Sequence, residues 1–235
     1  MSKTPLVIYH ASCFDGFTSA WLFYRHKNLF HSDGIEYHAA TYGEDPPDVK
    51  GREVYVVDFS YPREVMKAMI IESKKTTVLD HHKTAEAALS GLLMEIRMKV
   101  NRTQDVIVFD MNRSGAGITY DYLEEISAKK RGFRVPRHND QRGILLVDYI
   151  EDRDLWRMSL PGSHAVSAWV SAQPQTFESW DSLAEDVKPD IGGDSPAMHR
   201  GGAIMLYMAQ YGEKACEHAH VEKVGGHEVP VMNLP

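Results

Sequence analysis

Four short apolar runs, each followed at once by a side chain that can bind a metal ion, form the clearest pattern in the sequence. The runs cover residues 6–9, 54–57, 77–79 and 106–109, and the polar residues that follow them are His10, Asp58, Asp80 and Asp110. The runs are continuous and rich in β-branched residues, which is typical of strands buried on both faces of a parallel sheet. They predict four strands of one such sheet.

Helical segments lie between and after these runs, at residues 17–27, 63–73, 84–93 and 115–126. Alternation of strands and helices predicts an α/β fold with a mostly parallel β-sheet flanked by helices. Ligands of such sheets bind beyond the carboxyl ends of the strands. The polar residues that end the four runs are therefore expected at one edge of the sheet.

The second half of the chain is less regular. Residues 143–150 are compatible with a helix or a strand, and residues 196–220 predict one helix. Residues 173–194 are richer in Pro, Ser, Asp and Gly, which predicts a linker with one short helix. Residues 221–233 predict a turn and a strand.

The resulting division is a first domain at residues 1–172, a linker at 173–194, and the start of an incomplete second α/β domain at 195–235. One helix and one strand cannot bury both of their faces, so further chain is expected to complete this second domain.

Composition narrows the class of protein. The 235 residues are 43% hydrophobic and 25% charged, which excludes a disordered or fibrous chain. The two cysteines are too few for a disulfide framework, and a cytoplasmic location is expected. No apolar run is long enough for a membrane span or a secretory signal, so no membrane partner is expected. The oligomeric state is open, and a dimer is compatible with the sequence.

The formal net charge of −7 argues against binding of long nucleic-acid duplexes. It remains compatible with a small anionic substrate held by metal ions, because hard cations require carboxylate ligands.

The strongest chemical signal is Asp80-His81-His82, at the end of the third predicted strand. Two adjacent histidines alone usually reflect surface polarity. Here His10 and Asp58 are expected at the same edge, and a mixture of carboxylates and imidazoles suits Mn²⁺, Fe²⁺, Co²⁺ or Zn²⁺. The sequence therefore predicts a metal site.

Several motifs in order give the chain a resemblance to a known family, the DHH phosphoesterases. They lie at residues 10–16, 56–58, 79–85, 113–117 and 151–156. Within that family the chain most resembles the oligoribonucleases and cyclic-nucleotide phosphodiesterases. The resemblance implies hydrolysis of short oligoribonucleotides or small cyclic or linear dinucleotides by a hydroxide that two divalent metal ions activate. Mn²⁺ is the usual ion, with Zn²⁺, Fe²⁺, Co²⁺ or Mg²⁺ as alternatives.

The resemblance also implies residue roles. His10 would bind the first metal, Asp58 would bridge both, and Asp15, His81 and Asp152 would complete the second. Asp80 and His82 would be catalytic residues that orient the ligands or transfer protons.

Two positions in this set are open. Many relatives carry a second aspartate between the residues that correspond to His10 and Asp15. This chain lacks that aspartate, and it has Cys13 in the same short segment. The Cys13 thiol is either an additional ligand or a small buried side chain. Asp152 matches the last motif best, and Asp154 is the alternative.

Residues 113–117 read as a strand-to-helix turn. Arg113, Ser114 and Gly115, with Lys83, are candidates for binding substrate phosphate, because small residues and a helix N-terminus attract anions. An ordinary N-cap is the alternative. Trp156, Trp169 and Trp180 could stack on bases, although core packing is the simpler interpretation.

Two other functions are compatible with these residues. A pyrophosphatase or exopolyphosphatase would use the same metals but would not recognise a nucleobase. A non-catalytic nucleotide-binding regulatory protein becomes the alternative if the incomplete second domain is native.

Overall fold

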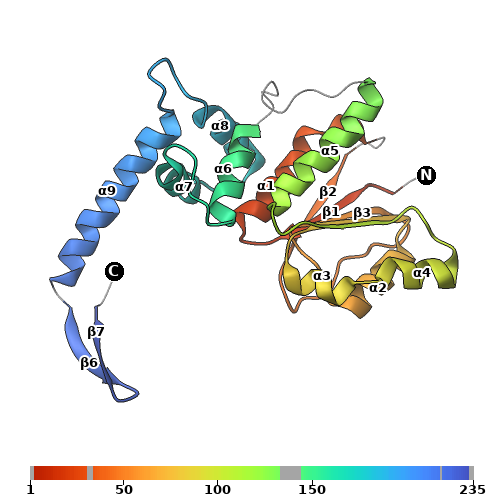
Figure 1. The fold of residues 1–235 in the computed structure, drawn as a ribbon, viewed down its shortest axis with the longest axis horizontal. Coiled ribbons are helices and arrows are strands. Elements are labelled where there is room, and N and C mark those ends of the chain that lie inside the picture. Colours follow the sequence, from red (N-terminus) through yellow and green to blue (C-terminus); the bar gives the residue numbers. More distant parts are fainter. Residues whose placement is uncertain (1–2, 31–33, 133–143, 218, 233–235) are drawn as a thin grey trace.

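The computed structural model describes residues 3–30, 34–132, 144–217 and 219–232. The predicted α/β fold is confirmed: a five-stranded parallel sheet has the order β2-β1-β3-β4-β5 and is flanked by helices (Figure 1). The strands are β1 Leu6–His10, β2 Glu36–Ala40, β3 Glu53–Val57, β4 Lys75–Asp80 and β5 Val106–Phe109.

Strand β2 is the one strand of this sheet that the apolar pattern does not predict. It pairs in parallel with β1, placing Glu36 beside Leu6 and Ala40 beside His10. Its sequence, Glu-Tyr-His-Ala-Ala, is mostly polar or small, and its side chains are largely exposed or half-buried. An edge strand needs no continuous apolar run, because only one side pairs and its faces are partly open to solvent.

Helices cover both faces of the sheet. Helices α1 Phe14–Arg25 and α5 Gly115–Arg131 lie on one face, and α2 Arg63–Glu72, α3 Lys83–Leu89 and α4 Leu92–Val100 lie on the other (Figure 1). A short 3₁₀ helix, Lys27–Leu29, follows α1. The single helix predicted at 84–93 is instead the pair α3 and α4, because Gly91 adopts a left-handed φ of 72° between them.

Side chains alternate between two apolar clusters across the sheet. Val7, Val57 and Leu79 belong to the cluster under α1 and α5. Ile8 and Val56, one position away, belong to the cluster over α2 and α4. Strands β1, β3 and β4 therefore bury both faces, which explains their apolar runs.

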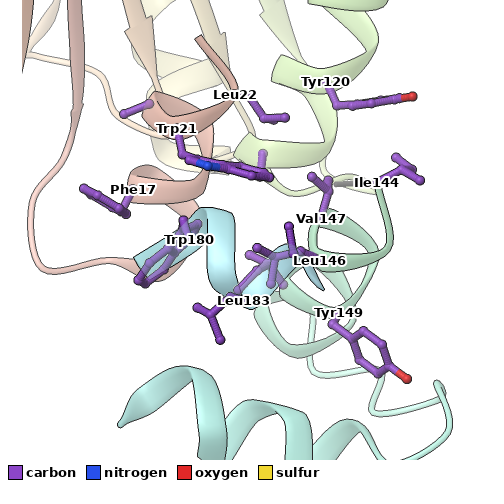
Figure 2. Close-up of a cluster of buried hydrophobic side chains, with 14 of the residues drawn as sticks. Phe17, Trp21, Leu22, Tyr120, Ile144, Leu146, Val147, Tyr149, Trp180 and Leu183 are labelled. Carbon is purple, nitrogen blue, oxygen red and sulfur yellow. The ribbon is translucent and has the colours of Figure 1, made fainter. Parts of the chain in front are cut away.

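The remaining helices are α6 Ile144–Asp154, α7 Ser163–Ser171, α8 Phe177–Asp186 and α9 Pro196–Cys216. In the segment at residues 143–150, for which the sequence allowed a helix or a strand, residues 144–150 therefore belong to helix α6. Residue 143 itself lies outside the described residues. Helix α8 lies within the predicted linker, yet its Trp180 and Leu183 are buried in the same cluster as Trp21 of α1 (Figure 2).

Helix α9 extends away from the sheet and leads into a two-stranded antiparallel hairpin of β6 His220–Val224 and β7 His227–Val231 (Figure 1). The prediction of a single strand here is wrong. Gly225 and Gly226 adopt φ values of 61° and 87°, so they form a two-residue turn that allows the chain to pair with itself. Among the helices of the described ranges, none combines the length and the apolar character needed to cross a bilayer.

The strand order reverses direction between β1 and β3. The helix after β1 lies on one face and the helix after β3 lies on the other. In open α/β sheets, ligands bind beyond the carboxyl ends of the strands at such a reversal. His10 ends β1 and Asp58 follows β3 directly. The topology thus brings the first two predicted ligands to the natural binding edge of the sheet.

Replacing Trp180 tests whether α8 belongs to the core. Its indole is fully buried and donates a hydrogen bond to Thr18 Oγ1 at 2.9 Å. We expect Trp180→Ala to lower the free energy of unfolding by about 3–5 kcal/mol in chemical denaturation. The exposed Ser182→Ala on the same helix is the control and should change it by less than about 0.5 kcal/mol. Equal midpoints for both variants would show that α8 is not part of the core.

Candidate metal centre

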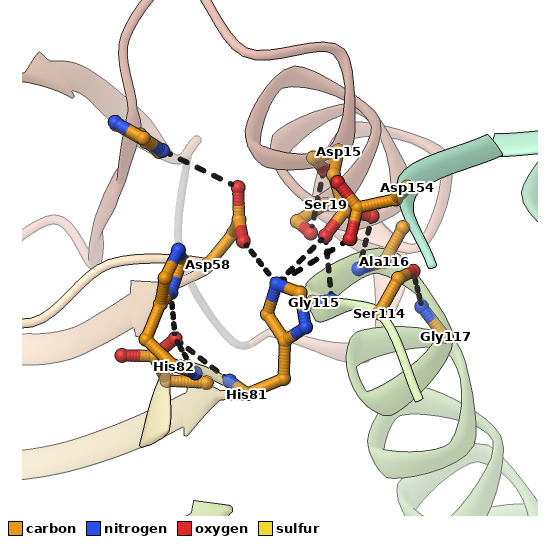
Figure 3. Close-up of polar contacts among 12 residues, drawn as sticks. Asp15, Ser19, Asp58, His81, His82, Ser114, Gly115, Ala116, Gly117 and Asp154 are labelled. Carbon is orange, nitrogen blue, oxygen red and sulfur yellow. Dashed lines mark hydrogen bonds and ion pairs between the residues drawn. The ribbon is translucent and has the colours of Figure 1, made fainter. Parts of the chain in front are cut away.

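Seven side chains with metal-binding atoms converge beyond β1, β3 and β4. Figure 3 labels five of them: Asp15, Asp58, His81, His82 and Asp154. They form three groups, within each of which the potential ligand atoms lie within 4.8 Å of one another. The groups are His10, Cys13 and Asp58; Asp58, His81 and His82; and Asp15, His81 and Asp154. Asp58 and His81 each belong to two groups, so neighbouring groups share a ligand.

Asp58 is the residue around which the groups are arranged. It is 1% exposed, and its backbone adopts a left-handed φ of 52°, a conformation that is uncommon for a non-glycine residue. Its Oδ1 lies 3.1 Å from His81 Nε2, and its Oδ2 lies 3.7 Å from His10 Nδ1. Within the described part of the chain, the buried Oδ2 has no hydrogen-bond partner. A buried carboxylate oxygen that accepts no hydrogen bond and lies among imidazoles fits a cation ligand.

His81 faces three carboxylates with one nitrogen. Its Nε2 lies 3.1 Å from Asp58, 3.5 Å from Asp154 and 3.8 Å from Asp15 (Figure 3). Burial disfavours the charged ring, but the hydrogen bond to Asp58 and the three negative charges raise the pKa of His81 to about 9. Without a metal ion, the protonated ring therefore supplies positive charge that the carboxylates require.

Burial and mutual repulsion shift the pKa values of the carboxylates around His81. Burial and the charge of Asp58 raise the pKa of Asp15, and burial is also the main cause of the raised pKa of Asp154. The pKa of Asp58 stays well below its usual range, because its contacts with the His10 and His81 imidazoles outweigh the effect of burial. The imidazoles offset part of the repulsion among these carboxylates, and divalent cations would offset more of it.

Asp80 holds the turn that carries the two histidines. It is fully buried, and its Oδ1 accepts hydrogen bonds from the backbone N–H groups of His81 and His82 at 2.7 and 3.2 Å. The same oxygen accepts from His82 Nδ1 at 2.7 Å, and Oδ2 accepts from Ser60 at 2.6 Å. His82 thus directs Nε2 away from Asp80, and the bond to Asp80 is the main cause of its raised pKa. Asp80 is a positioning residue, whereas His82 reaches the metal groups.

The structure brings Asp154, rather than the predicted Asp152, to His81. Asp152 lies two residues earlier on α6, about 200° around the helix, and accepts hydrogen bonds from Ser159 N and Oγ, Leu160 N and Ser163 Oγ. Burial opposes its ionisation, but the Ser159 and Ser163 hydroxyls lower the pKa of Asp152 to about 2. Asp152 is an ionised acceptor for the loop after α6. The motif alone did not separate the two residues, because only the helical phase of α6 decides which one faces β4.

The helix N-terminus predicted to hold phosphate is used by Asp15. Its Oδ2 accepts from Gly115 N at 2.6 Å, and its Oδ1 accepts from Ala116 N at 2.9 Å (Figure 3). A Cβ on Gly115 would lie 2.5 Å from Asp58 Cβ, so glycine permits this close approach. Ser114 caps its own helix by accepting from Gly117 N at 3.2 Å. The ordinary N-cap therefore describes Ser114 better than a phosphate site.

The basic candidates are also placed elsewhere. Arg113 donates to Glu151 at 2.8 Å and pairs with Asp121, and Lys83 is exposed at the start of α3. Glu151 also accepts from Ser114 N at 3.1 Å, which links α6 to the start of α5. Sequence reasoning missed Glu151, although its position three residues before Asp154 places both on one side of α6.

Cys13 is half-buried at the N-cap of α1 and belongs to a candidate group with His10 and Asp58. Burial and the nearby Asp58 charge raise the pKa of its thiol. It would therefore bind a metal only if the metal displaces the proton. Both alternatives for Cys13 remain compatible with this geometry.

Comparison with known proteins adds little about chemistry. No family model matches the chain. It is 26% identical over 196 residues to the uncharacterized protein R106 of Acanthamoeba polyphaga mimivirus, a match that covers 78% of this chain. The matched region spans 41% of the length of that viral protein.

The carboxylates around His81 predict an unusual titration. We expect the metal-free protein to show a His81 pKa of about 9 by NMR, and Asp58→Asn to move it toward the usual value of about 6.5. His81→Gln assigns the resonance. Because the folded-state pKa exceeds the unfolded one, the charged ring stabilises the metal-free protein fully below about pH 6.5. That contribution is lost as the pH rises through about 9. Titration of His81 near 6.5 would contradict this arrangement.

Replacement by asparagine should lower metal affinity at Asp154 but mainly lower stability at Asp152. Asp154→Asn removes a group beside His81 and should lower the affinity for divalent metal by at least about tenfold, measured by calorimetry. Asp152→Asn should leave metal affinity within about threefold but lower the free energy of unfolding by about 2 kcal/mol, because it weakens hydrogen bonds to a charged acceptor. The reverse result would restore Asp152 as the ligand.

Proposed function

We propose that this chain is a phosphodiesterase that uses two divalent ions, with Mn²⁺ as the first candidate, to hydrolyse short oligoribonucleotides or small dinucleotides. The observation that carries the proposal is the sharing of Asp58 and His81 among three groups of candidate ligands. Shared carboxylates are typical of sites in which two cations act on one phosphoryl group.

The ligand set supports a two-ion site. His10, Cys13 and Asp58 would hold one ion, and Asp15, His81 and Asp154 would hold the other, with Asp58 placed between them. Such ions lower the pKa of water and polarise a phosphoryl oxygen when bound. The nitrogen and carboxylate donors suit Mn²⁺, and the Cys13 thiol would favour Zn²⁺ or Fe²⁺ if it binds.

His82 is the candidate proton-transfer residue. Its Nδ1 is occupied by Asp80, and its ring lies against His81 with the centroids 4.7 Å apart. His82 belongs to the same group as Asp58, and 34% of its side chain is exposed. It could therefore give a proton to a departing oxygen or take one from water.

Charge and surroundings favour a small substrate. The chain carries a net charge of −7, and its metal groups border a cavity of about 460 Å³, which suits one or two nucleotides better than a duplex. The free Cys13 beside the metal groups suits a reducing compartment such as the cytoplasm.

The decisive assay is hydrolysis of the linear dinucleotide pApA with Mn²⁺, with pyrophosphate and a cyclic dinucleotide in parallel. We expect the parent protein to release mononucleotides and expect Asp58→Asn and His81→Ala to lose about a hundredfold or more of the rate. Asp110→Asn is the matched control. Asp110 also follows a strand, but it accepts from Asn112 N and lies outside the three metal groups.

Three results would overturn the proposal. Cleavage of pyrophosphate alone would favour the pyrophosphatase. Equal loss in Asp110→Asn would place the effect on folding rather than on metal binding. Binding of two Mn²⁺ ions without hydrolysis of any substrate would favour the non-catalytic nucleotide-binding protein.

A further inference from the structure

The cavity beside the metal groups is lined in part by residues that are not candidate metal ligands. Four of the metal-group residues border it: His10, Cys13, Asp15 and Asp154. The rest of the lining includes Phe14 and three residues at or beyond the end of α6, namely Arg153, Trp156 and Met158.

Trp156 has an unusual environment for a tryptophan. The residue is 85% exposed, whereas Trp21 and Trp180 are fully buried and Trp169 donates to Asp186 at 3.0 Å. Core packing therefore explains the other tryptophans and leaves Trp156 unexplained. A large indole at the rim of a cavity suits stacking on a planar ligand.

The backbone keeps Trp156 at this rim at a conformational cost. Trp156 and Met158 adopt φ values of 54° and 46°, which bulky residues rarely do outside functional sites. Asp152 holds the loop in place: its backbone oxygen accepts from Arg157 N at 2.9 Å, and its carboxylate accepts from Ser159 and Leu160. Asp152 is thus a positioning residue for Trp156.

Arg153 provides a cation at the same cavity. Its guanidinium lies 4.7 Å from the centre of the Phe14 ring, and its Nη1 is buried without a hydrogen-bond partner among the residues that the structure describes. Arg113 and Arg157, in contrast, both pair with Glu151. A guanidinium on the wall of this cavity fits an anionic ligand oxygen, which a guanidinium binds well.

We propose that Arg153 and Trp156 form a nucleotide subsite next to the metal groups, in which Trp156 stacks on the base and Arg153 binds a phosphate. A cavity of about 460 Å³ is large enough for a mononucleotide. The subsite rests on the proposed function, since it recognises the nucleotide part of the same substrate. It would make the protein select nucleotides over inorganic phosphates.

Equilibrium binding separates this subsite from catalysis. AMP, adenosine and ribose 5-phosphate are titrated into the full chain with Mg²⁺, by calorimetry and by indole fluorescence. We expect AMP to quench the emission of Trp156. Trp156→Leu should lower AMP affinity about tenfold or more without changing that for ribose 5-phosphate, and Trp156→Phe should stay within about threefold. Arg153→Met should weaken AMP and ribose 5-phosphate alike and spare adenosine.

The outcomes distinguish the subsite from the proposed function. Base-dependent binding that Trp156→Leu abolishes would support the subsite even if no dinucleotide is hydrolysed. Hydrolysis of pApA together with equal AMP affinity in the parent and Trp156→Leu would overturn the subsite and leave the phosphodiesterase standing. Equal loss of AMP and ribose 5-phosphate binding in Trp156→Leu would also overturn it. Unfolding midpoints of the Trp156 and Arg153 variants equal to that of the parent would show that these changes act on binding and not on folding.

Discussion

Three carboxylates meet around one imidazole, and the positive charge needed to keep them together is the constraint on which the site depends. His81 Nε2 lies within 3.8 Å of Asp58, Asp15 and Asp154. Burial removes most of the water that would screen their repulsion, which raises the pKa of Asp15 and of Asp154. Protonated His81 supplies part of that charge, and divalent ions would supply more.

The fold satisfies these charges from several directions. The N-terminus of α5 donates two backbone N–H groups to Asp15, and Gly115 allows that helix to approach Asp58 closely. On the other side, Asp80 accepts both backbone N–H groups of the His81-His82 turn. The close packing of β1, β3, β4 and α5 therefore serves the site directly, because each element contributes either a candidate ligand or a group that orients one.

The sequence by itself determined the scaffold and the chemistry at its edge. The apolar runs before His10, Asp58 and Asp80 predict β1, β3 and β4, because a strand buried on both faces favours a continuous run of apolar residues. Parallel strands with helical crossovers place their carboxyl ends together, so convergence of these residues follows from the pattern. Asp15 and His81 also belong to the groups of candidate metal ligands.

Only the tertiary structure decided which neighbouring side chain does what. Asp154 faces His81 whereas Asp152 holds the following loop, because the rotation of α6 against the sheet sets their directions. The start of α5 binds Asp15, a residue 100 positions earlier, in place of an anionic ligand. Trp180 is buried and Trp156 is exposed. A local sequence pattern shows which positions of a helix or strand are buried. Contacts such as Asp154 with His81 depend instead on how elements distant in the sequence pack together, which a local pattern does not encode.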